Sequence, residues 1–123
     1  MQPHFTGTCL LIDDVPRLAG FYAAVLDAEV EGGDPFARVV VPGAVLSFFS
    51  RRGMEAMVPG SAVSSARGGV TLEFRIADVD ACHERLLSQG VLILKPPTTQ
   101  AWGRRSVWVR DPDGAVVNLY QEV

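Results

Sequence analysis

Cysteine and histidine, the residues most used in disulfides, zinc sites and acid–base catalysis, are scarce in this sequence. The only cysteines are Cys9 and Cys82, and the only histidines are His4 and His83. Because no Cys-x-x-Cys pair occurs, the zinc-ribbon and thioredoxin-like classes are excluded, and two cysteines do not make a disulfide framework. We therefore expect two reduced and mostly buried thiols.

Long apolar runs and an excess of basic charge are also missing. No run approaches the roughly 18–20 apolar residues that span a bilayer, and the N-terminal Met-Gln-Pro-His-Phe has no basic segment ahead of an apolar one. The formal net charge is −3, whereas nucleic-acid-binding domains concentrate Lys and Arg on one face. These features predict a cytoplasmic protein with neither a membrane nor a nucleic-acid partner.

Hydrophobic residues are plentiful: they make up 48% of the 123 residues, while 20% are charged. This balance is typical of a folded globular protein rather than a disordered one. A chain of this length can bury one substantial core. We therefore expect a single domain over residues 1–123.

The first half of the chain predicts one helix among several strands. Asp14 is a suitable N-cap, and Pro16 is tolerated in the first turn that follows it. Apolar residues then recur at helical spacing to about Asp27, and the segment 32–35 interrupts the chain. Strands are expected at residues 6–12, 36–41 and 44–50.

The second half repeats this order. Ile12-Asp-Asp-Val15 reappears as Ile76-Ala-Asp-Val79, 64 residues later. A helix should follow, with one apolar face and an end at Gly90. That face would carry Val79, Cys82, Leu86 and Leu87. Strands are expected at 70–76 and 91–95, the second closed by Pro96-Pro97. Residues 51–68 show no clear pattern and are expected to form a mobile or functional loop.

The segment 102–121 predicts a closing β-hairpin. Its turn is Asp111-Pro112-Asp113-Gly114, in which Pro112 fixes φ and Gly114 allows a positive φ. The flanking runs are rich in Val, Trp, Leu and Tyr, which favour strands. Two copies of strand–helix–strand–strand–strand, over residues 6–50 and 69–121, predict the α+β class because the strands come in clusters.

The Arg-Asp-Pro-Asp-Gly hairpin and the paired Ile-x-Asp-Val helix starts resemble those of the vicinal-oxygen-chelate superfamily. Glyoxalases, extradiol dioxygenases, fosfomycin-resistance enzymes and bleomycin-binding proteins belong to it. The resemblance covers nearly the whole chain. It implies two βαβββ modules forming a curved mixed sheet with a concave ligand cavity, and it implies a homodimer.

In metal-dependent members of that superfamily, four cavity positions usually supply His, Glu, His and Glu. They lie seven residues before each capping aspartate and four residues after each hairpin glycine. Here they are Gly7, Ser47, Thr71 and Asn118. Neutral hydroxyl and amide oxygens are poor ligands for zinc, iron or nickel, and His4 and His83 fall elsewhere. We therefore expect no metal and no cofactor.

Strand alternation predicts which side chains would line the cavity. Residues two apart share a face, so an inward Thr71 brings Glu73 and Arg75 with it. The resemblance to fosfomycin-resistance enzymes also places Ser106 and Trp108 inward. The predicted ligand-binding residues are Cys9, Phe49, Thr71, Glu73, Arg75, Ser106, Trp108, Asn118 and Tyr120.

Three of these residues have two interpretations each. Glu73 and Arg75, two charges expected on a buried face, either anchor a polar ligand or pair with cross-strand or dimer neighbours. Glu73 is also the candidate general base. Trp108 either fills the core or offers a flat stacking surface.

Three hypotheses for the function follow. The first is a metal-free small-molecule-binding protein of the bleomycin-resistance type. The second is a metal-independent isomerase or lyase that uses Glu73 for proton transfer. The third is a dimerising interaction module. No nucleophile elbow, phosphate-binding glycine loop or histidine partner for Cys9 supports another chemistry.

Overall fold

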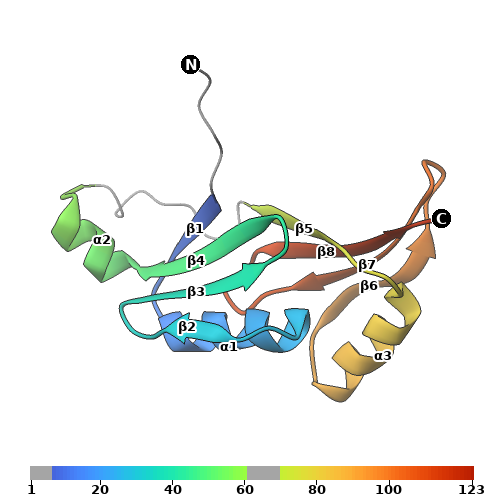
Figure 1. Cartoon of the computed structure of the whole chain (residues 1–123), viewed down its shortest axis with the longest axis horizontal. Coiled ribbons are helices and arrows are strands. Elements are labelled where there is room, and N and C mark those ends of the chain that lie inside the picture. The colour runs from blue at the N-terminus through green and yellow to red at the C-terminus, as the bar shows by residue number, and fades with distance from the viewer. Residues whose placement is uncertain (1–6, 61–69) are drawn as a thin grey trace. The chain divides into compact units, whose positions relative to one another are not determined.

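The computed structural model describes residues 7–60 and 70–123 of a chain that forms two compact units, residues 1–65 and 66–123 (Figure 1). The N-terminal unit contains β1 (Gly7–Ile12), α1 (Val15–Leu26), β2 (Val30–Gly32), β3 (Phe36–Val41), β4 (Ala44–Ser50) and α2 (Arg51–Met57). The C-terminal unit contains β5 (Thr71–Arg75), α3 (Val79–Ser88), β6 (Ile93–Thr99), β7 (Arg104–Arg110) and β8 (Val116–Glu122). The expected α+β class, built from two βαβββ modules, is confirmed.

Helix α1 has the predicted beginning and end. The Asp14 carboxylate accepts a hydrogen bond of 3.1 Å from the Arg17 backbone N–H, which satisfies one of the free donors of the first turn. Asp27 ends the helix with a φ of 52°, and the Ala28 N–H bonds to the Ala23 carbonyl at 2.9 Å. No helix in the described part of the chain is long and apolar enough to cross a membrane.

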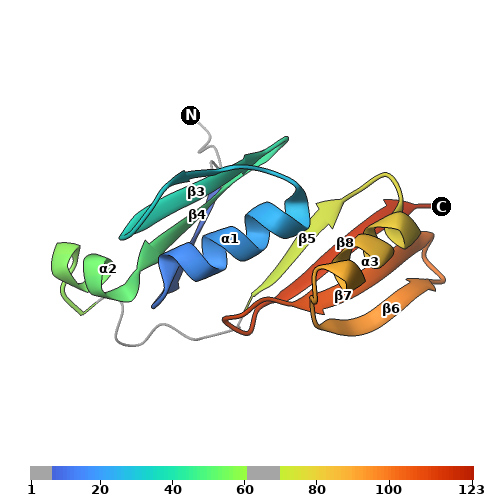
Figure 2. The ribbon, with the colours of Figure 1, turned by 90° about the horizontal axis from the view of Figure 1, so that it is seen from below.

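Sheet A, in the N-terminal unit, has the strand order β1-β4-β3-β2, with β1 parallel to β4 and the other pairs antiparallel. Helix α1 covers one face of the sheet (Figure 2). There the Tyr22 ring stacks on Phe48 with 5.5 Å between centroids. The buried apolar residues of this layer are Ile12, Val15, Leu18, Ala19, Tyr22, Val25, Ala37, Val39, Leu46 and Phe48.

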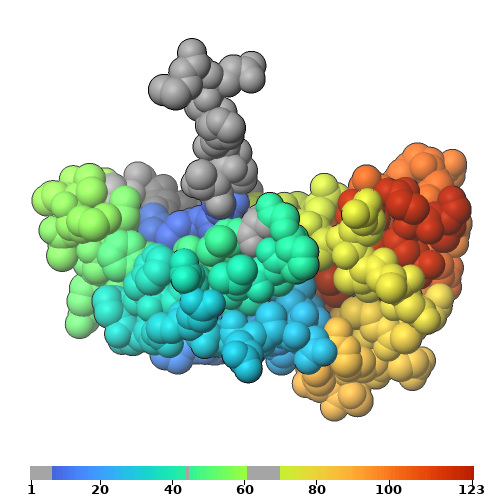
Figure 3. Space-filling model, viewed as in Figure 1, coloured from blue at the N-terminus to red at the C-terminus, as the bar shows by residue number. Residues whose placement is uncertain are grey.

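Two elements of the N-terminal unit were not predicted. Strand β2 pairs with β3 along the edge of sheet A, and both lie at the surface of this unit, in cyan and teal in Figure 3. The expected loop over 51–68 is wrong for its first part, because Ser50 caps α2 by accepting a hydrogen bond of 2.9 Å from the Gly53 N–H. A Cβ at Gly53 would lie 2.6 Å from the Phe49 ring, so glycine lets the helix approach it. Residues 61–69 lie outside the described part.

Sheet B, in the C-terminal unit, repeats the pattern with the order β5-β8-β7-β6, in which β5 is parallel to β8. Helix α3 packs on one face of it (Figure 2). The buried apolar residues of this unit are Val79, Cys82, Leu86, Val107, Val109, Ala115, Val117 and Leu119. Leu87 was expected among them, but it is 50% exposed because it lies beside the stripe of α3 that meets the sheet.

Side-chain bonds from β7 and β8 attach the beginning of α3 to the sheet. Asp78 caps the helix by accepting a hydrogen bond from the Ala81 N–H, and the Gln121 side-chain oxygen accepts one from the Val79 N–H. Arg105 forms two hydrogen bonds with the Asp80 carboxylate, of 3.0 and 2.8 Å. The predicted Gly90 follows the C-cap with a φ of 71°.

The prolines of β6 do not end that strand, contrary to the sequence prediction of a strand at 91–95. The strand runs from Ile93 to Thr99 through Pro96 and Pro97. Its pairing with β7 shifts register between Ile93 and Lys95 and again between Lys95 and Thr98. An edge strand with such irregularities tolerates proline because its outer N–H groups need no partner.

The β7–β8 hairpin has the predicted turn. Asp111 Oδ1 accepts hydrogen bonds from the backbone N–H groups of Asp113 and Ala115 at 2.8 and 2.9 Å. Gly114 has a φ of 99°, which only glycine adopts readily. Asp111 is 4% exposed, so a buried carboxylate holds the backbone of the turn.

Candidate functional site

The face of sheet B that lies opposite α3 carries most of the predicted ligand-binding residues. Arg105 and Gln121 bond to α3, so alternation places the other set of β7 and β8 side chains on the opposite side. We call this side the distal face of sheet B. Its predicted members are Thr71, Glu73, Arg75, Ser106, Trp108, Asn118 and Tyr120.

A row of polar and aromatic residues crosses the centre of this face. The strand register pairs Glu73 of β5 with Asn118 of β8, and it pairs Asn118 with Trp108 of β7. Lys95 of β6 is the next partner of Trp108. In antiparallel strands such as β7 and β8, side chains that are register partners have Cβ atoms about 4.5–5.5 Å apart. The row therefore brings together residues separated by up to 45 positions.

Asn118 is the central residue of the row. Its Nδ2 donates a hydrogen bond of 3.1 Å to Glu73 Oε2, and the residue is only 4% exposed. The other arm of the amide, Oδ1, is buried and has no hydrogen-bond partner in residues 7–60 and 70–123. Buried polar atoms are nearly always hydrogen-bonded in folded proteins, so this oxygen is a vacant acceptor.

Glu73 and Arg75 are exposed, contrary to the expectation of two charges on a buried face. The reason is their position on β5, which is an edge strand of sheet B. Glu73 has the cross-strand neighbour that the structural interpretation required, although this partner is the neutral amide of Asn118 rather than a cation. The Asn118 amide fixes the orientation of the Glu73 carboxylate.

Trp108 is half-buried beside Asn118, so part of the residue is accessible to solvent. It is neither a fully buried core residue nor a free surface group. Trp102 is different: it lies between β6 and β7, outside any strand, and is 71% exposed. The distal face thus has one tryptophan whose ring both packs and remains accessible.

A second row lies on the same face, two residues further along each strand. It joins Arg75, Tyr120 and Ser106, of which Ser106 is 2% exposed. The Arg104 guanidinium lies 4.0 Å from the Tyr120 ring centroid and pairs with Glu122 at 3.4 Å. Arg104 was not among the predicted residues. Its alternation with Ser106 and Trp108 along β7 is the pattern that indicates this placement.

The two remaining predicted residues, Cys9 and Phe49, lie on sheet A, on the face opposite α1. Cys9 is exposed, contrary to the expectation of two mostly buried thiols, whereas Cys82 is buried. Cys9 pairs in register with Ser47, and Ser47 pairs with Arg38. Partial desolvation raises the pKa of the Cys9 thiol, which disfavours the reactive thiolate. Phe49 is half-buried and meets the Phe36 ring edge-on at 6.0 Å.

The residues at the four metal-ligand positions of the resemblance do not fit a transition metal. Gly7 has no side chain, and a Cβ there would meet the Val45 carbonyl oxygen at 2.8 Å. Ser47, Thr71 and Asn118 offer only neutral oxygens, which are weak ligands for such ions. In the described segments, no group of three or more His, Cys, Asp or Glu side chains could hold an ion. His4 lies outside them, and His83 is half-buried on α3.

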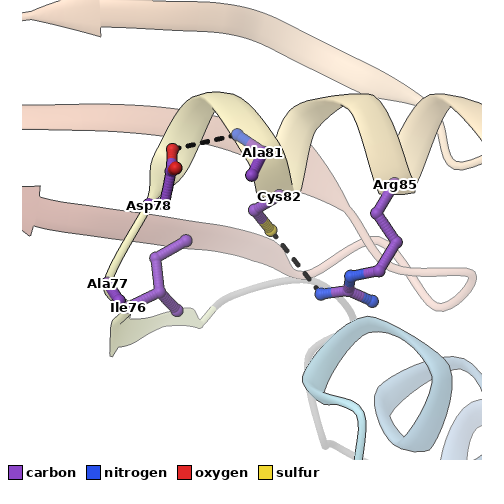
Figure 4. Close-up of a pocket in the computed structure, with 6 residues that line it drawn as sticks. All are labelled: Ile76, Ala77, Asp78, Ala81, Cys82 and Arg85. Carbon is purple, nitrogen blue, oxygen red and sulfur yellow. Dashed lines mark hydrogen bonds between the residues drawn. The ribbon is translucent and has the colours of Figure 1, made fainter.

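A pocket of about 320 Å³ lies near the beginning of α3 and is lined by Ile76, Ala77, Asp78, Ala81, Cys82 and Arg85 (Figure 4). Arg85 Nη2 donates to the Cys82 sulfur at 3.7 Å, and Asp78 caps the helix. Burial raises the pKa of the Cys82 thiol. None of the predicted ligand-binding residues lines this pocket, and its polar groups bond to one another.

A family model described as the Glyoxalase/Bleomycin resistance protein/Dioxygenase superfamily matches residues 2–119. No protein with curated annotation matches the chain.

Solved structures share the fold along the whole chain. A glyoxalase/bleomycin resistance protein/dioxygenase from Nocardioides is 21% identical with a TM-score of 0.83, and the match covers 100% of this chain and 85% of the Nocardioides chain. A family enzyme from Burkholderia phytofirmans PsJN is 14% identical with a TM-score of 0.83, and the match covers 96% of this chain and 98% of that one. A virulence protein from Salmonella typhimurium is 20% identical with a TM-score of 0.80, at 100% and 99% coverage. Identities this low show the fold alone.

Proposed function

The chain belongs to the glyoxalase/bleomycin resistance protein/dioxygenase superfamily, and from this we propose that it binds a small organic molecule on the distal face of sheet B without a metal ion. The observation that carries the proposal is the vacant, buried acceptor Oδ1 of Asn118. It lies in one row with an oriented carboxylate and a partly accessible indole ring.

The energetics of Asn118 support a binding role. A buried polar group without a partner costs about 1–3 kcal/mol, and an apolar residue at this position would avoid that cost. A ligand that donates a hydrogen bond to Oδ1 would recover it. Residues kept at a cost to folding are typical of functional sites.

Trp108 supplies what a binding protein of this kind needs besides a polar anchor. Ligand sites are mostly apolar or aromatic, with a few placed polar groups that fix the orientation of the ligand. The half-buried ring of Trp108 lies directly beside Asn118. Since neighbours hold part of the ring, stacking a ligand on it would cost little conformational entropy.

A second candidate function is a metal-independent isomerase or lyase with Glu73 as general base. The supporting observation is that the Glu73 carboxylate is exposed and also held by the Asn118 amide. A general base must reach the proton that it removes in a fixed geometry. Glu73→Gln separates the two functions. It should lower turnover by about 10²–10⁴ in an enzyme, whereas a binding protein has no turnover to lose.

Native mass spectrometry of the untagged protein tests the binding proposal. We expect a population heavier than the chain by one small organic molecule, either as purified or after incubation with a library of planar, polar compounds. Trp108→Ala should lose this adduct. Ser47→Ala, at the corresponding position of sheet A, is the control and should keep it. An adduct that survives in Trp108→Ala would place the site elsewhere, and the absence of any adduct would contradict the proposed function.

A further inference from the structure

The distal face of sheet B presents hydrogen-bond acceptors at its centre. Asn118 donates one N–H of its amide to Glu73, and its buried Oδ1 has no partner among the described residues. An ionised carboxylate accepts hydrogen bonds and donates none. A ligand that binds over Asn118 would therefore meet two kinds of acceptor, the Asn118 amide oxygen and the Glu73 carboxylate oxygens.

We infer that the ligand of this site carries an N–H donor group on a planar cation, as in an amidine, a guanidine or a protonated amino-heterocycle. This inference rests on the proposed function and adds the chemical class of the ligand to it. An N–H group would satisfy Asn118 Oδ1, and the positive charge would be stabilised by the Glu73 carboxylate. The planar group would lie on the Trp108 ring, where a cation is attracted to the π face.

The opposite class, a carboxylate or phosphate ligand, has some support from the cations on the same face. Arg75 lies two residues from Glu73, and Lys95 is the register partner of Trp108. Both are exposed, as Glu73 is, so water solvates all three charges. Arg104 is engaged by Tyr120 and Glu122. The buried group decides between the classes, because an anion would leave the Asn118 oxygen unsatisfied and would lie beside a carboxylate.

Three probes with the same ring and different polar groups test this inference: benzamidine, benzamide and benzoate. Each is titrated into the wild-type protein at low salt and followed by calorimetry and by Trp108 emission in a Trp102→Phe background. We expect benzamidine to bind at least about tenfold more tightly than benzoate, a difference of about 1.4 kcal/mol. Benzamide, which has the donor without the charge, should fall between them.

Two variants assign the preference to its residues. Asn118→Leu removes the acceptor and should reduce the preference for benzamide over benzoate, and Glu73→Gln should reduce the preference for benzamidine over benzamide. Ser47→Ala on sheet A should change neither ratio. If Asn118→Leu does not fold, the ranking of the three probes on the wild-type protein still tests whether the site prefers a planar cation.

Two results would overturn the inference. One is equal or tighter binding of benzoate. The other is no binding of benzamidine at low-millimolar concentration. Either result leaves the proposed function standing when native mass spectrometry finds another small molecule that Trp108→Ala loses. If no small molecule of any class binds, the proposed function fails together with the inference.

Discussion

Asn118 of β8 and Glu73 of β5 are joined by a hydrogen bond of 3.1 Å between the amide nitrogen and a carboxylate oxygen, across two parallel strands. The bond uses one arm of the amide and leaves the other arm buried and unsatisfied. The unsatisfied oxygen of Asn118 has consequences for the free energy of unfolding and for the kind of ligand that can bind.

The first prediction concerns the stability cost of Asn118. Removing one partner of a hydrogen bond is costly when the group left behind is buried, but Glu73 is exposed and water can replace Asn118. Asn118→Leu should therefore keep the free energy of unfolding within about 1 kcal/mol of wild type, or raise it. Urea denaturation of both proteins measures the difference. A loss of more than about 2 kcal/mol would mean that Oδ1 has a partner in solution.

The second prediction concerns metal content. Gly7, Ser47, Thr71 and Asn118 provide no imidazole, carboxylate or thiolate at the four ligand positions. Elemental analysis of protein purified without a histidine tag should find far less than one transition-metal ion per chain. Near-stoichiometric zinc, iron, nickel or manganese, removed by a chelator with loss of ligand binding, would overturn the metal-free proposal.

The third prediction concerns self-association, since we propose that the protein forms a homodimer. Edge strand β6 and the residue before it expose apolar side chains, with Leu92 65% and Leu94 42% exposed. Proteins commonly cover or blunt such edges. Light scattering at micromolar concentration should give twice the mass of one chain. Leu92→Lys together with Leu94→Lys should shift the protein to the monomer if this edge is used, and a wild-type monomer would contradict the proposal.

The fourth prediction concerns acid stability. Hydrogen bonds from Arg105 lower the pKa of Asp80 below its usual value. A carboxyl group with a lowered pKa stabilises the fold above its unfolded pKa, and this contribution is lost as pH falls through the folded pKa. Arg105→Gln should therefore melt at a slightly lower temperature than wild type at neutral pH, the effect being small because water screens this exposed pair.

The gap in melting temperature between Arg105→Gln and wild type should narrow as pH falls below about 4, where Asp80 begins to be protonated in the unfolded chain, and should close once pH passes below its lowered pKa in the fold. Melting curves across this range measure it. Arg38→Gln is the matched control, because it removes another exposed pair, with Glu31 in the N-terminal unit, and leaves Asp80 and Arg105 intact. A gap that stays constant down to pH 2 would show that Arg105 acts through packing rather than charge.

Local chemistry explains which parts of the fold could be predicted from the sequence. The caps at Asp14 and Asp78 and the turn at Asp111 depend on residues within a few positions of one another, and the structure has all three. Strand β2 and helix α2 are short. One depends on pairing with β3, and the other on the approach of Gly53 to Phe49. Elements this short show too little hydrophobic periodicity for the sequence to predict them.

The sequence predicted which side of each strand the site residues lie on, but not which of these residues contact one another. The resemblance and strand alternation together placed Glu73, Trp108 and Asn118 on the same side of their strands. That Asn118 would meet Glu73 depends on β8 lying between β5 and β7 and on a parallel register between β5 and β8. Strand order is a property of the whole sheet. The vacant oxygen of Asn118 follows from that order and could not be read from the sequence.

The last prediction concerns Trp108. Stacking of a planar group on an aromatic side chain is worth about 1–3 kcal/mol, so Trp108→Ala should raise the dissociation constant of a bound ligand roughly five- to hundred-fold. Trp102→Ala is the control, because this 71% exposed residue lies outside the strands. It should leave the dissociation constant unchanged, and ligand binding should change the emission of Trp108 more than that of Trp102.

The alternative for Trp108 is a purely structural role, and one variant separates the two. Removing a core tryptophan costs about 3–5 kcal/mol of folding stability, whereas the half-buried Trp108 should cost less. Melting temperature and ligand titration are measured on the same Trp108→Ala protein. A large loss in melting temperature with normal binding by the folded fraction would assign Trp108 to the core. The ligand would then have to bind away from the row that joins Glu73, Asn118 and Trp108.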